Sequence, residues 1–176
     1  MMVFLKVAAA VPMVSVANCN ANAQEIINLM HKADSQRVTL VVFSELCITG
    51  YTCGDLFLQT ALIGSAENNL LRLVRETAEL EIISIVGLPF VYDCKLYNCA
   101  AVVYKGDILG IVPKIHLPNY GEFYEARHFA AGTATDYEVN VGSFSPTFGI
   151  DQVFQCEELP DLTFGVEICE DLWVSE

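Results

Sequence analysis

The chain has 176 residues, with 22 acidic and 9 basic side chains, and its formal net charge is −13 at pH 7. Hydrophobic residues make up 53% and charged residues 18% of the sequence, a balance that excludes an intrinsically disordered chain. The few basic residues disfavour binding to nucleic acids and to anionic membrane surfaces, because both need clustered Lys and Arg. The length suits one domain with a substantial core.

Apolar runs alternate with helical patterns in the first half of the chain. Strands are expected at Val3–Val11, Val38–Phe43 and Glu81–Val91, and amphipathic helices at Asn22–Ala33 and Asn68–Leu80. The run at 38–43 is continuously apolar, which is typical of a strand covered on both faces. A signal peptide is an alternative interpretation of the N-terminus, since Lys6 precedes an apolar run, but Pro12 and the Val-rich composition favour a strand.

The second half of the chain predicts a hairpin and two further strands. Lys105-Gly106-Asp107 is typical of a hairpin turn. The expected strands are Tyr97–Tyr104, Ile108–Val112, Val153–Cys156 and Leu162–Ile168. This order indicates an α/β fold with mixed strand directions. Because the chain stops soon after the last expected strand, we expect the sequence to be a fragment.

Seven cysteines are present, at positions 19, 47, 53, 94, 99, 156 and 169. An odd number of cysteines in a chain with a large core favours reduced thiols and a cytoplasmic location. The pairs Cys47/Cys53 and Cys94/Cys99 lack the C-x2-C spacing of zinc sites, and the nearby histidines lack helical spacing. No metal site is therefore expected.

Three residues with ionisable side chains that could take part in catalysis follow the ends of expected strands: Glu45, Lys114 and Cys169. Ligands of α/β sheets bind outside such ends. Each residue also has an ordinary structural explanation: Glu45 as a loop acid, Lys114 as a lysine with its head in solvent, and Cys169 as a small buried hydrophobe. If Cys169 precedes a helix, the helix N-terminus would lower the pKa of its thiol and offer donors to an oxyanion.

Together, the three residues predict covalent acyl transfer at one edge of one sheet. A carboxylate base, a cation that stabilises an oxyanion and a thiol nucleophile are the groups that this reaction needs. The sequence has no histidine placed for a papain-like Cys–His pair, since His31 lies on a polar helix face and His116 and His128 need not be catalytic.

These residues lie in three motifs, S-E-L-C-I-T-G-Y at 44–51, P-K-I-H-L-P-N-Y-G-E-F-Y-E-A-R at 113–127 and G-V-E-I-C-E-D-L-W at 165–173. Through them the chain resembles the carbon–nitrogen hydrolase (nitrilase) superfamily and, within it, the N-terminal glutaminase domains of glutamine-dependent NAD+ synthetases. The resemblance implies Glu45 as base, Lys114 as oxyanion stabiliser and Cys169 as nucleophile of glutamine amide hydrolysis through a thioester. It further implies glutamine contacts from residues matching Tyr51, Tyr120, Phe123 and Glu125, with Glu125 pairing with the substrate ammonium. Glu122 is a possible additional acid near the triad.

The resemblance also sets expectations for the whole protein. It implies an αββα sandwich, incomplete at the C-terminus, in which residues 1–176 are a partial glutaminase domain. The ammonia would pass to a synthetase domain of the same polypeptide, which would use ATP and Mg to make NAD+ from nicotinic acid adenine dinucleotide. The chain has no P-loop, so this chain alone is not expected to bind or consume ATP. The resemblance implies no cofactor for the glutaminase step. Family members of this kind are expected to form homo-oligomers.

Two alternatives remain at this stage. The chain could be a free-standing amidase of the same superfamily that acts on another small amide. It could also be a non-catalytic binding domain, in which Cys169 would be no more reactive than the other cysteines. For a truncated domain we also expect exposed apolar surface or an open sheet edge, and therefore a tendency to associate. Such a fragment can be inactive even with its triad intact.

Overall fold

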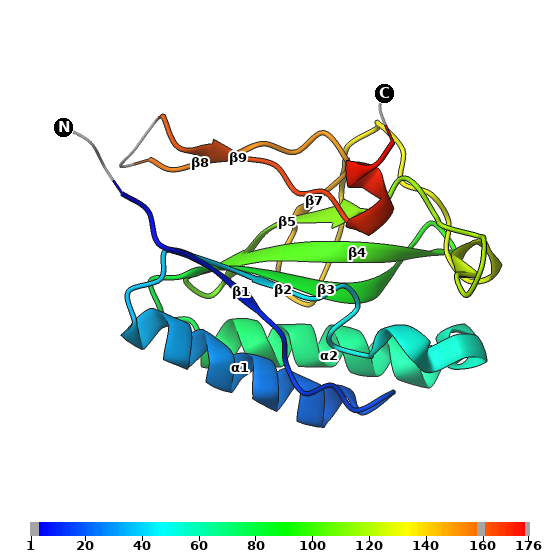
Figure 1. The fold of residues 1–176 in the computed structure, drawn as a ribbon, viewed down its shortest axis with the longest axis horizontal. Coiled ribbons are helices and arrows are strands. Elements are labelled where there is room, and N and C mark those ends of the chain that lie inside the picture. Colours follow the sequence, from blue (N-terminus) through cyan, green and yellow to red (C-terminus); the bar gives the residue numbers. More distant parts are fainter. Residues whose placement is uncertain (1–3, 158–160, 175–176) are drawn as a thin grey trace.

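The computed structural model describes residues 4–157 and 161–174. Within these ranges, a seven-stranded sheet has the order β1-β2-β3-β4-β5-β7-β6 (Figure 1). Its strands are β1 Val7–Ala10, β2 Leu40–Phe43, β3 Ile83–Tyr92, β4 Lys95–Tyr104, β5 Asp107–Pro113, β6 Tyr137–Glu138 and β7 Thr147–Phe148. Strands β1 to β3 are parallel, β3 to β5 alternate in direction, and β7 is parallel to β5. The mixed α/β sheet predicted from the sequence is confirmed, including the hairpin of β4 and β5.

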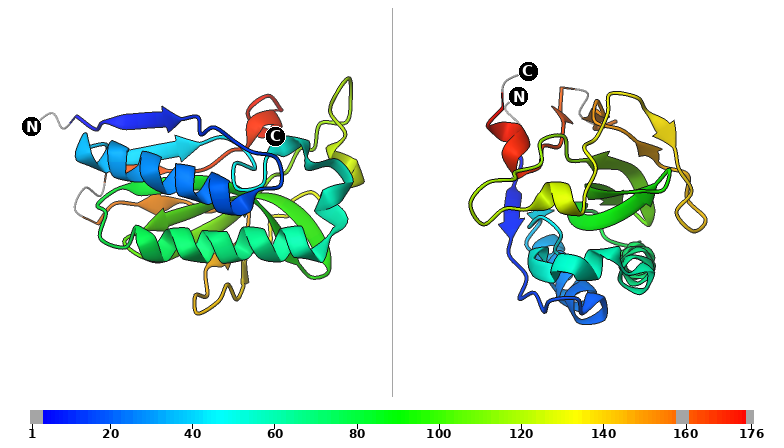
Figure 2. Two further views of the ribbon diagram at one scale, coloured as in Figure 1. Left: turned by 90° about the horizontal axis from the view of Figure 1, so that it is seen from below. Right: turned by 90° about the vertical axis from the view of Figure 1, so that its right-hand side faces the viewer.

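Two helices, α1 Cys19–Ser35 and α2 Thr60–Glu76, lie side by side along one face of the sheet (Figure 2). Their buried residues recur every three or four positions, which gives each helix one apolar face. Fully buried examples are Ile26 in α1 and Leu70 and Val74 in α2. The helix expected at 22–33 is confirmed with a slightly earlier start, where the Asn18 side chain accepts a hydrogen bond from the Ala21 N–H at 3.2 Å.

The helix expected at 68–80 was placed too late in the sequence. Its buried face already begins with Leu62 and Ala66, and α2 therefore starts at Thr60. Gly64 breaks the helical pattern in the sequence, but it has open space around it and the helix tolerates it. The helix ends at Glu76, before the expected Leu80, and the Thr77 hydroxyl then donates to the Leu73 carbonyl at 2.8 Å.

The opposite face of the sheet is only partly covered. A separate antiparallel pair, β8 Phe154–Gln155 and β9 Thr163–Phe164, lies over it (Figure 1). The longer strands expected at 153–156 and 162–168 are wrong, because only two residues of each pair with a partner strand. Coverage of β2 on both faces is also wrong, since Val41 is buried whereas Val42 is 39% exposed.

Short segments complete the described chain. Three 3-10 helices are η1 Tyr51–Leu58, η2 Glu125–Arg127 and η3 Cys169–Leu172. The first strand, expected at 3–11, is shorter, and residue 3 lies outside the described residues. In the described ranges, the cysteines form no disulfide. None of the helices in these ranges has the length and apolar character needed to cross a membrane.

Candidate active site

Two strand ends define the candidate active site. Strands β2 and β5 run in the same direction, so their carboxyl ends lie at the same edge of the sheet. Glu45 follows the end of β2, and Lys114 follows Pro113, the last residue of β5. In the neighbouring strand β4, the Asn98 carbonyl accepts a hydrogen bond from the Lys114 backbone N–H at 2.8 Å. The sheet thus fixes the backbone from which the Lys114 side chain departs.

The Lys114 side chain is fully buried and lies between two carboxylates. Its Nζ donates to Glu45 Oε1 at 2.7 Å and to Glu125 Oε1 at 2.8 Å. Burial alone lowers the pKa of Lys114, but hydrogen bonds to Glu125 and Glu45 outweigh it, so the pKa is raised above its ordinary value. Lys114 therefore stays charged, and its two partners hold its ammonium in place.

Two neutral side chains, Asn98 and Tyr51, complete this arrangement. We call the five residues the Lys114 cluster: Lys114, Glu45, Glu125, Asn98 and Tyr51. Asn98 is fully buried, and its Nδ2 donates to Glu45 Oε1 and to Glu125 Oε2. The Tyr51 hydroxyl donates to Glu125 Oε1 at 2.8 Å. Burial and the neighbouring Glu125 raise the pKa of Tyr51 well above its ordinary value, so the hydroxyl remains a donor. Asn98 was not among the site residues predicted from the sequence, although a polar residue within an apolar strand was an available signal.

A close approach of two backbones positions Glu45. A Cβ at Gly87 of β3 would collide with the backbone of Ser44 and Leu46, so only glycine lets the loop lie on the strand. The Ile48 N–H donates to the Gly87 carbonyl at 3.2 Å. Leu46 has a φ of 52°, in the left-handed region. These contacts hold the loop in a conformation that directs Glu45 toward Lys114. The role of Gly87 was not predicted from the sequence.

Cys169 is exposed at the start of η3, and its φ of 51° lies in the left-handed region. Nucleophiles at sharp turns share this unfavourable backbone conformation, which the surrounding structure must hold. The pKa of the Cys169 thiol is raised, first by partial desolvation of this otherwise exposed side chain and then by the Glu45 charge, with Lys114 acting in the opposite direction. The expectation that a helix N-terminus lowers this pKa is wrong, because η3 has only four residues and the site is rich in carboxylates.

Glu45 and Cys169 line one cavity of about 380 Å³. The sequence predicted that Cys169 follows a strand of the main sheet, and this is wrong. Strand β9 belongs to a separate pair, and residues 165–168 are irregular. The segment before Cys169 instead lies over the main sheet, where Ile168 packs with Ile85 and Val102. The thiol therefore reaches the same edge of the sheet by a different route.

The predicted aromatic residues gather beside the Lys114 cluster. The rings of Tyr51 and Phe123 lie edge to face at 6.4 Å, and those of Tyr120 and Phe123 at 5.7 Å. Tyr120 is 59% exposed, and its hydroxyl donates to the Glu170 carboxylate at 3.0 Å. Because Glu170 follows Cys169 in the chain, these three rings form an aromatic wall that extends from Tyr51 to the turn that contains Cys169.

The two acids of the loop after β5 have different surroundings. Glu125 is 3% exposed, and its carboxylate accepts hydrogen bonds from Lys114 and Tyr51. These partners occupy the carboxylate that was expected to bind the substrate ammonium. Glu122 is exposed and lines a separate cavity of about 180 Å³ together with Tyr51 and Glu125. The structure thus places Glu125, rather than Glu122, as the second carboxylate beside Lys114.

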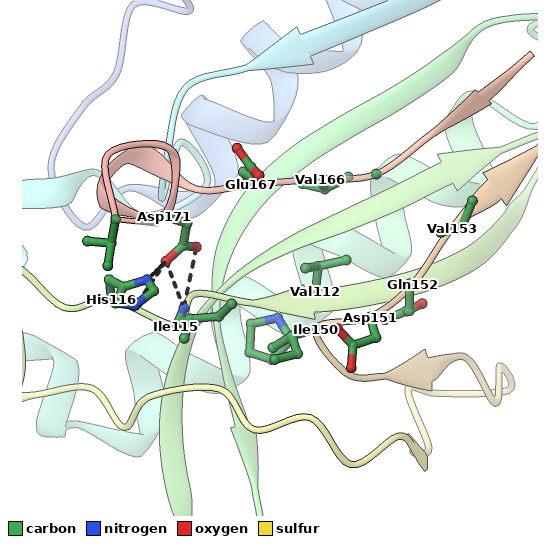
Figure 3. Close-up of a pocket in the computed structure, with 13 residues that line it drawn as sticks. Val112, Ile115, His116, Ile150, Asp151, Gln152, Val153, Val166, Glu167 and Asp171 are labelled. Atoms are coloured by element: carbon green, nitrogen blue, oxygen red, sulfur yellow. Dashed lines mark hydrogen bonds and ion pairs between the residues drawn. The ribbon is translucent and has the colours of Figure 1, made fainter. Parts of the chain in front are cut away.

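A further cavity of about 680 Å³ shares residues 165–167 with the cavity of Glu45 and Cys169 (Figure 3). Asp171 and His116 lie at one end of it, and Asp151 and Gln152 lie at the other (Figure 3). The His116 Nδ1 is 3.2 Å from Asp171 Oδ1. His116 is thus engaged with an acid of the turn that contains Cys169.

The family model of the carbon–nitrogen hydrolases matches residues 7–176. This chain belongs to the carbon–nitrogen hydrolase family. Over 171 residues it is 37% identical to a protein of Mycobacterium tuberculosis named glutamine-dependent NAD(+) synthetase, and the match covers 97% of this chain and 25% of that protein. The chain thus spans about a quarter of the length of the curated relatives it matches.

Solved structures show the same relationship. The crystal structure of a glutamine-dependent NAD(+) synthetase from Cytophaga hutchinsonii matches with a TM-score of 0.86 and 28% identity, over 95% of this chain and 28% of that chain. An amidase from Nesterenkonia matches with a TM-score of 0.62 and 19% identity, over 82% of this chain and 56% of that chain. The second match shows a shared fold.

Proposed function

We propose that this chain is the glutaminase part of a glutamine-dependent NAD+ synthetase, with Cys169 as nucleophile, Glu45 as proton carrier and Lys114 as oxyanion stabiliser. The observation that carries the proposal is a fully buried Lys114 paired with Glu45, which shares a cavity with the exposed Cys169. A purely structural lysine would not need this arrangement, whereas a buried cation bonded to a carboxylate that shares a cavity with a thiol supplies the three groups of acyl transfer.

The reaction begins with proton transfer from the thiol to Glu45. The pKa of the Cys169 thiol is raised, so the thiol is protonated at neutral pH and needs a base as it attacks the amide carbon. Lys114 stabilises the oxyanion of the tetrahedral intermediate. The C–N bond then breaks, Glu45 returns the proton to the leaving nitrogen, and ammonia departs from a thioester on Cys169.

Hydrolysis of the thioester completes the cycle. Glu45 takes a proton from a water molecule, which attacks the thioester carbon through a second tetrahedral intermediate. The C–S bond breaks, the thiol regains the proton, and glutamate is released. In this scheme Glu125, Asn98 and Tyr51 do not react, but hold Lys114 and Glu45 in place through their hydrogen bonds.

Glutamine is proposed as the substrate from the names of the relatives and from the aromatic wall. Tyr51, Phe123 and Tyr120 would flank the methylene chain of glutamine, which apolar walls bind well. The substrate ammonium needs another acid, since Glu125 is occupied. Glu122, which lines a cavity with Tyr51, and Glu170, which accepts a hydrogen bond from Tyr120, are further acids beside this wall. In the whole protein, the ammonia would pass to an ATP- and Mg-dependent synthetase domain, and the glutaminase step itself would need no cofactor.

Product analysis tests the proposed substrate. We expect glutamate to form from L-glutamine faster than aspartate forms from L-asparagine or propionate from propionamide, when the 176-residue chain is incubated with each amide. A preference for propionamide would instead favour a free-standing amidase with the same triad. The absence of any product from the three amides, both in this chain and in a longer chain that completes the domain, would contradict both assignments.

Replacing Glu45 by Gln should separate the two effects of this carboxylate on Cys169. Loss of the proton carrier should reduce glutamine hydrolysis about 10²- to 10⁴-fold. Because the Glu45 charge raises the pKa of the Cys169 thiol, its removal should lower that pKa and increase the thiolate fraction at a given pH. Alkylation of Cys169 by iodoacetamide at pH 7 to 8 should therefore become faster, as peptide mass spectrometry can measure.

Glu122→Gln is the matched control, because it removes one charge from an exposed acid of the same region. It should leave the pH dependence of Cys169 alkylation unchanged. In the parent chain, the alkylation rate should rise about tenfold per pH unit between pH 7 and pH 8, as expected for a thiol below its pKa. Slower alkylation in Glu45→Gln than in the parent chain would contradict the assigned electrostatics.

A further inference from the structure

The Asp171 carboxylate joins two segments that are far apart in the sequence. Its Oδ1 accepts hydrogen bonds from the backbone N–H groups of Ile115 at 3.1 Å and His116 at 2.7 Å. These residues directly follow Lys114 in the chain. Figure 3 shows the carboxylate beside both residues, with the His116 ring on the same oxygen. The side chain is 7% exposed, so these contacts are shielded from solvent.

The same carboxylate also binds the turn that carries the nucleophile. Its Oδ2 accepts a hydrogen bond from the Ile168 N–H at 3.3 Å, and Ile168 immediately precedes Cys169. The Asp171 N–H donates to the Ile168 carbonyl at 3.2 Å. A turn with Cys169 in the left-handed region is intrinsically unfavourable, so it needs such contacts to stay in one conformation.

We propose that Asp171 is a positioning residue that aligns the Cys169 turn with the segment after Lys114, and thereby sets the distance between the nucleophile and the oxyanion stabiliser. This inference rests on the proposed function of Cys169 and Lys114. Cys169 and Lys114 come from segments that share no strand pairing, because β9 pairs only with β8. Asp171 bridges these segments through backbone N–H groups on both sides, and charge-assisted bonds to a carboxylate are stronger than neutral ones.

The test replaces Asp171 by Asn, which keeps the shape of the side chain. One of the two carboxylate oxygens becomes an NH2 group, which cannot accept a hydrogen bond from a backbone N–H. The 176-residue chain and the variant are inactivated with a diazo-ketone analogue of glutamine. We expect the maximal rate kinact to fall about 10- to 100-fold, because a small displacement of a reacting group has such effects. The half-saturation constant KI should change less than about twofold, since Asp171 does not belong to the aromatic wall.

Two further variants separate positioning from charge and from folding. Asp151→Asn removes one charge at the other end of the same cavity and should leave kinact unchanged (Figure 3). Asp171→Glu keeps the charge and both acceptor oxygens but adds one methylene, so it should retain the fold and still lower kinact. A parental kinact in both Asp171 variants would overturn the proposal.

Hydrogen exchange gives a readout that does not depend on the proposed function. Amide exchange of peptides covering 114–118 and 166–173 should be faster in Asp171→Asn than in the parent chain and unchanged in Asp151→Asn. If neither the parent chain nor a longer chain that completes the domain is inactivated, the proposed function fails, and the exchange result alone decides whether Asp171 joins the two segments. Unchanged exchange in Asp171→Asn would overturn the positioning role in either case.

Discussion

Cys169→Ala is expected to abolish glutamine hydrolysis, with a loss of at least about 10⁴-fold. The substitution removes the atom that forms the thioester, and neither Glu45 nor Lys114 can replace it as a nucleophile. Glutamate release from glutamine measures the loss, and intact-mass spectrometry should show no covalent adduct with the diazo-ketone analogue. Cys169 is exposed and is not part of the buried apolar core, so the free energy of unfolding should change by less than about 1 kcal/mol.

Cys94→Ala is the matched control for this experiment. Cys94 is the other cysteine that is exposed in the described residues, and it lies in the turn between β3 and β4. Its removal should leave hydrolysis within about twofold of the parent chain and should leave the adduct in place. Equal losses in both variants, or an unchanged rate in Cys169→Ala, would show that the nucleophile is wrongly assigned.

Lys114→Met should have the largest effect on stability. The substitution leaves Glu45 and Glu125 facing each other without their cation, and Glu125 is nearly completely buried. Removing one partner of a buried ion pair typically costs about 3–5 kcal/mol, because a charge remains buried without compensation. Urea denaturation should therefore show a loss of this size, and hydrolysis should fall below detection with the oxyanion stabiliser gone.

A double substitution separates the charge effect from packing. In Lys114→Met combined with Glu125→Gln, one of the two facing charges is removed, so about 1–3 kcal/mol of the lost stability should return. Lys95→Met, at an exposed lysine of β4, should change the free energy of unfolding by less than about 0.5 kcal/mol. A loss below about 1 kcal/mol in Lys114→Met would contradict the ion-pair account.

Local patterns predicted the central elements of the fold well. The helical spacing at 22–33 and the Lys105-Gly106-Asp107 turn are local features, and the structure has a helix and a hairpin there. The start of α2 was misplaced because the prediction rested on the apolar residues from Leu70 onward, whereas the buried face of the helix already begins with Leu62 and Ala66. The strand expected at 162–168 has an apolar pattern, but its pairing depends on a partner that only the folded chain reveals.

Some residues of the candidate site could likewise be predicted from local patterns, whereas others depend on long-range packing. The positions of Glu45 and Lys114 followed from strand ends, which the sequence indicates directly. Asn98 contacts both carboxylates only because β4 lies between β3 and β5 with one particular register, which no local pattern specifies. The burial of Glu125 depends on how the loop after β5 returns to the sheet, where the Glu125 N–H donates to the Pro118 carbonyl at 3.2 Å. Long-range packing, rather than composition, therefore decides which acids act together.

Covalent labelling with the diazo-ketone analogue of glutamine tests the central claim most directly. The 176-residue chain would be incubated with the analogue, with and without excess L-glutamine, and analysed by intact-mass spectrometry and peptide mapping. We predict a single adduct on Cys169 that glutamine suppresses, because the thiol, Glu45 and Lys114 then act on a glutamine-shaped electrophile. The claim would be contradicted if iodoacetamide labels Cys169 while the analogue does not, or if the analogue reacts equally with Cys94.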